Sequence, residues 1–142
     1  MPASVFVDTS AFYALADTTE GPHRRAAPIA RDLERTRTRL VLTNFIRAEA
    51  HALILNRLGR HAADRFIAEL ASAPHSTLVR VSEADEQAAL SLIAQYHDRT
   101  FTLVDATSFV VMGRLHITHA FMFDRNFVQY GFLTRTYSPA GR

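Results

Sequence analysis

The sequence of 142 residues contains neither cysteine nor lysine. Without cysteine the chain can form no disulfide and no thiolate-bound metal site, so a reducing compartment is the natural expectation. No apolar run approaches the roughly 20 residues that a bilayer-spanning helix needs. The apolar start, Val5 to Val7, is too short for the core of a signal peptide, and Asp8 interrupts it. We therefore expect a cytoplasmic protein that does not associate with membranes.

The positive charge of the chain comes entirely from arginine: 16 basic residues stand against 14 acidic ones, for a formal net charge of +2. Arginine binds phosphate through a bidentate fork that lysine lacks. Several arginines alternate with apolar residues in the predicted helix at 21–38, as in an amphipathic helix. They could contact phosphate groups or a partner protein, or they could form a solvated face. If some of the acids are buried, arginines outnumber acids on the surface, and such a basic surface suits a polyanionic substrate or an acidic partner.

Short apolar strands alternate with helices along the whole chain. We predict strands at 4–7, 40–42, 77–81, 120–123 and 132–137, and helices at 10–16, 21–38, 44–58, 60–73, 82–96 and 103–115. Wholly apolar strands joined by helices are typical of a parallel α/β sheet that is covered on both faces. The length suits a single domain over residues 1–142, with a frayed tail from about residue 138.

Four acidic residues are embedded in apolar sequence at predicted strand ends or in early helical turns. They are Asp8, Glu49, Asp105 and Asp124. Burying an unpaired carboxylate is costly, so four of them beside core residues indicate that they gather around a cation. Asp8 and Asp124 directly follow apolar strands, at the sheet edge where parallel α/β proteins bind ligands. The pattern predicts a divalent cation held by oxygen ligands, and hydrolysis of phosphodiesters.

Each of these acids also has a simpler structural explanation. Asp8 or Asp124, taken alone, is most simply a helix N-cap. Asp105 follows Thr102 by three positions, which is the spacing of a capping box. Glu49 could form an ion pair with a neighbouring arginine. All of these explanations would have to hold together for the predicted site to vanish.

Other hydrolytic sites fit the sequence poorly. The seven histidines are scattered without metal-binding spacing, which argues against a histidine-bound zinc. Neither Ser10 nor Ser108 has the histidine and acid that a serine nucleophile needs. A phosphatase with an aspartate nucleophile after the first strand needs a second Asp, where this chain has Ser10, and a lysine, which the chain lacks.

Four short segments, taken in their order along the chain, carry a resemblance to a known family. They are VDTSA at 7–11, RAE at 47–49, VDATS at 104–108 and FDRNF at 123–127. Together they resemble the PIN-domain ribonucleases, and within that family the VapC toxins of bacterial toxin–antitoxin pairs. The resemblance implies a PIN-like three-layer sandwich, with a central, mainly parallel sheet of four to five strands and helices on both faces.

The resemblance also implies roles for individual residues. The catalytic residues would be Asp8, Glu49, Asp105 and Asp124, which would also bind Mg²⁺ or Mn²⁺. Thr9 and Ser10 match the hydroxyl residues that orient the first acid. Asn126 stands where many relatives carry another acid, and its carbonyl can still bind metal without charge. Met122 stands where relatives often carry threonine or serine.

The implied function is that of a metal-dependent endoribonuclease acting as the toxin of a VapBC-type pair. Its partners would be RNA, a VapB-like antitoxin and a second copy of the chain. The apolar faces around 45–58 and 66–70 are the predicted dimer contacts. Two alternatives stay open at this point. One is a PIN-domain nuclease that processes RNA without being a toxin, and the other is a PIN-like module that binds RNA or protein without cleavage.

Overall fold

A five-stranded sheet forms the middle layer of the protein, seen in a computed structural model that describes residues 2–19, 21–97, 100–123 and 135–136. In sheet order its strands are β3 (Ser76–Val79), β2 (Arg39–Thr43), β1 (Ser4–Val7), β4 (His119–Phe121) and β5 (Arg135–Thr136). Every neighbouring pair is parallel, which confirms the predicted sheet. The predicted strand at 132–137 is described at β5 alone, and the tail from about residue 138 lies outside the described residues.

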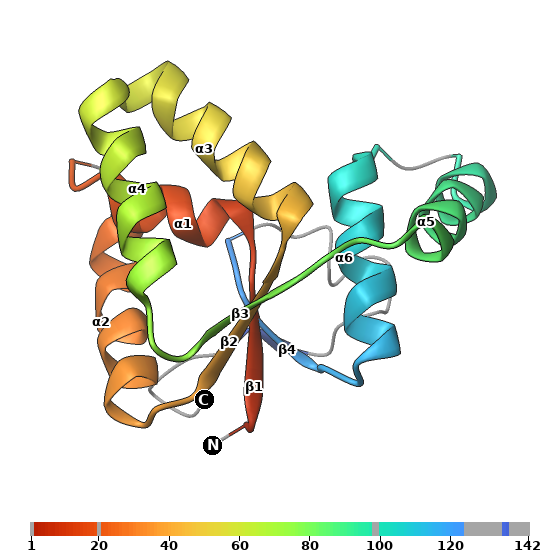
Figure 1. Ribbon diagram of the computed structural model, residues 1–142, viewed down its shortest axis with the longest axis horizontal. Coiled ribbons are helices and arrows are strands. Elements are labelled where there is room, and N and C mark those ends of the chain that lie inside the picture. Colours follow the sequence, from red (N-terminus) through yellow and green to blue (C-terminus); the bar gives the residue numbers. More distant parts are fainter. Residues whose placement is uncertain (1, 20, 98–99, 124–134, 137–142) are drawn as a thin grey trace.

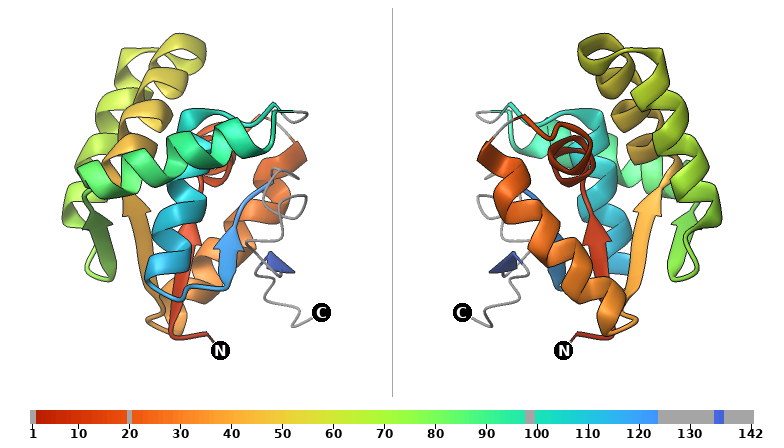
Figure 2. Two further views of the ribbon diagram at one scale, coloured as in Figure 1. Left: turned by 90° about the vertical axis from the view of Figure 1, so that its right-hand side faces the viewer. Right: turned by 90° about the vertical axis from the view of Figure 1, so that its left-hand side faces the viewer.

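Helices cover both faces of this sheet. In the described part of the chain they are α1 (Thr9–Ala16), α2 (Gly21–Arg35), α3 (Asn44–Leu58), α4 (Arg60–Ser72), α5 (Glu83–Gln95) and α6 (Leu103–Arg114). Figure 1 shows α1 to α4 on one side of the sheet and α5 and α6 on the other, which gives the predicted three layers. Figure 2 shows α5 and α6 from one side, and α1 and α2 from the opposite side. None of these helices is both long and apolar enough to cross a membrane.

Side chains of β1 alternate between the two helical layers. Val5 and Val7 are buried in the cluster formed with α1 and α2, whereas Phe6 is buried in the cluster formed with α5 and α6. In the second cluster Phe109 is fully buried and packs edge-on against Phe101. Both faces of the strand are therefore dry, which explains why its sequence is apolar throughout.

The helix predicted at 21–38 ends at Arg35, three residues early. The hydroxyl of Thr36 donates a 2.9 Å hydrogen bond to the backbone carbonyl of Asp32, and Arg37 takes a positive φ of 55°. A residue in this left-handed conformation stops an α-helix. Arginine is an unusual residue for such a position, so the sequence pattern does not mark this end.

Two strands also end two residues earlier than predicted, because the following backbone groups turn to side chains. β3 ends at Val79, and the Val81 N–H donates a 2.8 Å hydrogen bond to the Asn44 side-chain carbonyl. β4 ends at Phe121, and the Phe123 N–H donates to a hydroxyl of α1. Both hydrogen bonds lie at the carboxyl edge of the sheet. They tie the backbone that follows a strand to the first turn of a helix, α3 in the first case and α1 in the second.

A capping box starts α5 and is extended by a salt bridge. Asp85 is 4% exposed, accepts the Ser82 N–H and receives two hydrogen bonds of 2.9 and 2.8 Å from the guanidinium of Arg114. These contacts join the start of α5 to the end of α6. The Arg114 guanidinium, with smaller help from Ser82, holds the pKa of Asp85 below its ordinary value of 3.8.

Removing the Asp85 carboxylate is expected to destabilise the protein in a pH-dependent way. A lowered folded-state pKa contributes stability that is present above pH 3.8 and is lost as the pH falls through the folded-state value. We expect Asp85→Ala to lower the free energy of unfolding by about 1–2 kcal/mol at pH 7, measured by urea denaturation. The difference from wild type should shrink below pH 3.8. Asp64→Ala is the control, because its ion pair with Arg60 is exposed on both sides. Equal effects of the two substitutions at pH 7 would contradict this account.

Candidate active site

Asp8 lies at the carboxyl end of the central strand. Its N–H still pairs with the Phe121 carbonyl of β4 at 3.1 Å, and its side chain caps α1. The residue is 4% exposed. In the strand order β3-β2-β1-β4-β5 the chain crosses from one half of the sheet to the other beside β1. Asp8 therefore occupies the topological switch point, where parallel α/β proteins bind their ligands.

Ser10 holds the Asp8 carboxylate in place. Both the N–H and the hydroxyl of Ser10 donate to Asp8 Oδ2, at 3.1 and 2.7 Å. The same hydroxyl accepts a 2.9 Å hydrogen bond from the Phe123 N–H. Asp8 is thus tied, through one serine, to the backbone that follows β4. Thr9 takes no part in this network: its hydroxyl is buried and has no hydrogen-bond partner within the described residues.

Asp105 occupies the first turn of α6 and is 8% exposed. Its Oδ2 accepts the Thr102 N–H at 3.0 Å, and its own N–H donates to the Thr102 hydroxyl at 3.1 Å. The capping box suggested by the sequence is therefore present. A cap and a ligand role do not exclude each other, because a carboxylate has two oxygens with about four lone-pair sites.

Glu49 lies in the second turn of α3 and is half-buried. The fully buried stripe of this helix consists of Ile46, Ala50 and Ile54. The apolar sequence around Glu49 predicts a place on the buried face of the helix, whereas the structure places Glu49 at the border of that face. The border position leaves a carboxylate less costly to desolvate than a central one would be.

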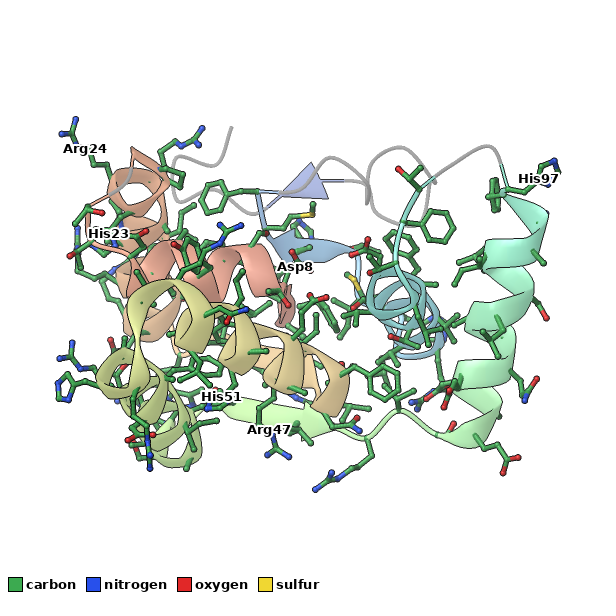
Figure 3. All side chains as sticks on the ribbon, turned by 90° about the horizontal axis from the view of Figure 1, so that it is seen from above. Asp8, His23, Arg24, Arg47, His51 and His97 are labelled. Atoms are coloured by element: carbon green, nitrogen blue, oxygen red, sulfur yellow. The ribbon has the colours of Figure 1, made fainter. Side chains whose placement is uncertain are left out.

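Three helices begin at the same edge of the sheet. In Figure 1 the N-termini of α1, α3 and α6 all lie at the upper end, beyond the tips of the strands. Figure 3 looks onto this edge and shows Asp8 between these helices. Helix N-termini carry partial positive charge, which favours carboxylates and phosphates nearby. The edge therefore combines buried acids with a field that stabilises anions.

The predicted quartet is only partly visible in the structure. Asp124 and Asn126 lie outside the described residues. Among the residues that are described, no group of three or more His, Cys, Asp or Glu side chains is placed to hold a metal ion. Convergence of all four acids on one cation stays a prediction. Met122, at a position where relatives often carry a hydroxyl residue, is buried in the core on the α5–α6 side.

The family assignment follows from comparison with known proteins. The model of the PIN domain family matches residues 5–133, which is most of the chain. The chain belongs to the PIN-domain family. The resemblance carried by its four acidic motifs is thereby confirmed.

Relatives of this PIN domain include VapC20 and VapC26 of Mycobacterium tuberculosis. The 23S rRNA-specific endonuclease VapC20 is 34% identical over 133 residues, which cover 91% of this chain and 95% of the relative. Ribonuclease VapC26 is 26% identical over 121 residues, or 85% of this chain and 87% of the relative. The crystal structure of VapC20, a sarcin–ricin loop cleaving toxin, matches with a TM-score of 0.81 at 28% identity and covers 91% of this chain and 96% of that one.

Proposed function

We propose that this PIN domain is an endoribonuclease and the toxin of a VapBC-type toxin–antitoxin pair. The observation that carries the proposal is its 34% identity to a 23S rRNA-specific endonuclease over nearly the full length of both chains. The burial of Asp8 at the switch point of the sheet supports the same conclusion. The relationship to named toxins favours this function over an RNA-processing nuclease or a module that binds without cutting.

We infer that activity depends on Mg²⁺ or Mn²⁺. The donor chemistry fits these ions, because carboxylate oxygens are available and the chain has no cysteine. The residues that would hold the ion are Asp8, Glu49, Asp105 and Asp124. When bound, such an ion lowers the pKa of a coordinated water and stabilises charge on phosphate oxygens.

The chain's own residues prepare the site for this chemistry. Ser10 fixes the orientation of Asp8 through two hydrogen bonds to Oδ2, and the Thr102 N–H fixes Asp105 through a single hydrogen bond to its Oδ2. Locked side chains keep ligand geometry with little entropy loss on binding. The helix N-termini at this edge attract the RNA backbone, which the acids alone would repel.

Controlled expression in bacteria tests the proposed toxin function. Induction should arrest growth, and sequencing of RNA 5′ ends should show new ends at discrete sites, with 23S rRNA as the first RNA to inspect. Co-expression with an adjacent small gene should relieve the arrest and yield a complex without nuclease activity. Growth arrest without new RNA ends would contradict an endoribonuclease. New ends that no neighbouring gene suppresses would favour an RNA-processing enzyme instead.

We propose that the chain forms a homodimer through the faces around 45–58 and 66–70. Each range carries a large exposed apolar side chain, Leu55 at 42% and Ile67 at 40%. Wild-type protein should sediment as a dimer at micromolar concentration. Ile67→Arg should shift it toward monomer without unfolding it, whereas Leu90→Arg, an exposed apolar position on α5, should not. A wild-type monomer under these conditions would contradict the dimer.

A further inference from the structure

One arginine of α2 is stacked on an aromatic ring at the carboxyl edge of the sheet. The guanidinium carbon of Arg25 lies 5.1 Å from the ring centroid of Phe123. That ring is itself held edge-on against Phe121 at 6.2 Å and packs on the apolar cluster beneath α1 and α2. Arg25 is exposed. An exposed arginine is usually mobile, but this one rests on a surface that the core fixes.

Arg25 carries a charge that no acid neutralises in the described part of the chain. The ion pairs found there are Arg35–Asp32, Arg60–Asp64 and Arg114–Asp85. A guanidinium held over a ring by its charge keeps N–H donors for other partners. Those donors form a planar fork that can bind a phosphate in a bidentate manner.

A chain of contacts connects Arg25 to the candidate site. The ring under Arg25 belongs to Phe123, whose N–H donates to the Ser10 hydroxyl, and this hydroxyl donates in turn to Asp8. Phe123 also directly precedes Asp124 in the sequence. Ring contact and hydrogen bonds therefore link the position of the Arg25 guanidinium to that of the Asp8 carboxylate.

We propose that Arg25, stacked on Phe123, is a binding subsite for a backbone phosphate of the RNA strand that enters the Asp8 site. This inference rests on the proposed function. RNA approaching buried carboxylates meets repulsion, and an unneutralised arginine on the rim offsets it. A phosphate contact sets the register of the strand without reading its bases. Arg25 would thus position any RNA sequence equally.

Binding measurements in EDTA, which prevents metal-dependent cleavage, test this subsite. Fluorescence anisotropy with two labelled single-stranded RNAs of unrelated sequence gives Kd over a range of salt concentrations. Arg25→Ala should weaken binding of both RNAs by roughly tenfold. It should also reduce the slope of log affinity against log salt by about 0.7, the value for one phosphate on single strands. With Mn²⁺ present, KM should rise more than kcat falls.

Arg24→Ala is the matched control, because it removes the same charge from the next position. Arg24 is exposed, and Figure 3 shows it pointing out of the molecule, away from Asp8. Phe123→Leu should reproduce the loss seen with Arg25→Ala, and the double variant should lose little more, because the two side chains act as a unit. Arg25→Lys should restore the charge but only part of the affinity.

Equal affinity and equal salt slope for Arg25→Ala and Arg24→Ala would overturn the subsite while leaving the nuclease intact. Failure of the wild-type protein to cut RNA in Mn²⁺ is a separate readout. That result would overturn the proposed function, and the subsite with it.

Discussion

Asp8→Asn is expected to lower RNA cleavage by about 10²–10³-fold or more while leaving the fold intact. The substitution removes one negative charge from the predicted metal site and changes almost nothing else. Asparagine ranks with aspartate as an N-cap. Its side-chain carbonyl can accept the same two hydrogen bonds that Ser10 donates to Asp8 Oδ2. The loss of activity should therefore come without a loss of stability.

Asp17→Asn provides the matched control for this experiment. Asp17 is also buried and also adjoins α1, but as the C-cap at the opposite end of the helix, where its side chain accepts hydrogen bonds from Tyr13 and Thr19. It should keep near-wild-type cleavage. Melting curves by circular dichroism should show that Asp8→Asn melts no lower than wild type. Wild-type cleavage rates for Asp8→Asn would remove Asp8 from the mechanism.

Removal of divalent cations is expected to abolish cleavage completely, and Mn²⁺ or Mg²⁺ to restore it. Without a cation, the carboxylates predicted to hold the ion could not activate water and would repel the phosphate backbone. Binding should also be visible without any RNA. A ligand that binds only the folded state raises its stability by RT ln(1 + [L]/Kd), so Mn²⁺ should raise the melting temperature of the wild-type protein.

The same titration on Asp8→Asn should show a much smaller rise, since a ligand of the ion is missing. An equal rise in both proteins would place the bound ion elsewhere on the molecule. Full nuclease activity in excess EDTA would contradict metal dependence altogether.

The layers of this protein and the succession of its strands and helices along the chain follow from patterns that are local in sequence, whereas the order of the strands within the sheet does not. β1 and α3 have the boundaries predicted for them, because punctuation marks their ends: Asp8 follows the strand, and Gly59 takes a φ of 93° after the helix. The end of α2 was not predictable in this way. It depends on Arg37 adopting a positive φ, a conformation for which arginine has no preference.

The candidate site was predictable in composition but not in its connections. Apolar flanking sequence marks Asp8 and Asp105 as buried acids, and the structure shows that Asp8 is also the N-cap of α1 and Asp105 the acid of the capping box of α6. Cap and site were competing explanations at the level of sequence, yet the same carboxylate can serve both. The bond between Ser10 and Phe123 spans 113 residues, and no local pattern indicates such a pair. The sequence does not reveal the contact of Arg25 with the Phe123 ring for the same reason, since the two residues are far apart in the chain.

The most direct test of the central claim is cleavage of a defined RNA by purified protein, with 5′ ends mapped by sequencing. The protein is first stripped with EDTA, and wild type and Asp8→Asn are then compared with and without added Mn²⁺. Discrete new ends are expected for the wild type with Mn²⁺, and none in the other three reactions. Cleavage by Asp8→Asn at the same sites, or by stripped wild type without Mn²⁺, would contradict a metal-dependent nuclease site built on Asp8.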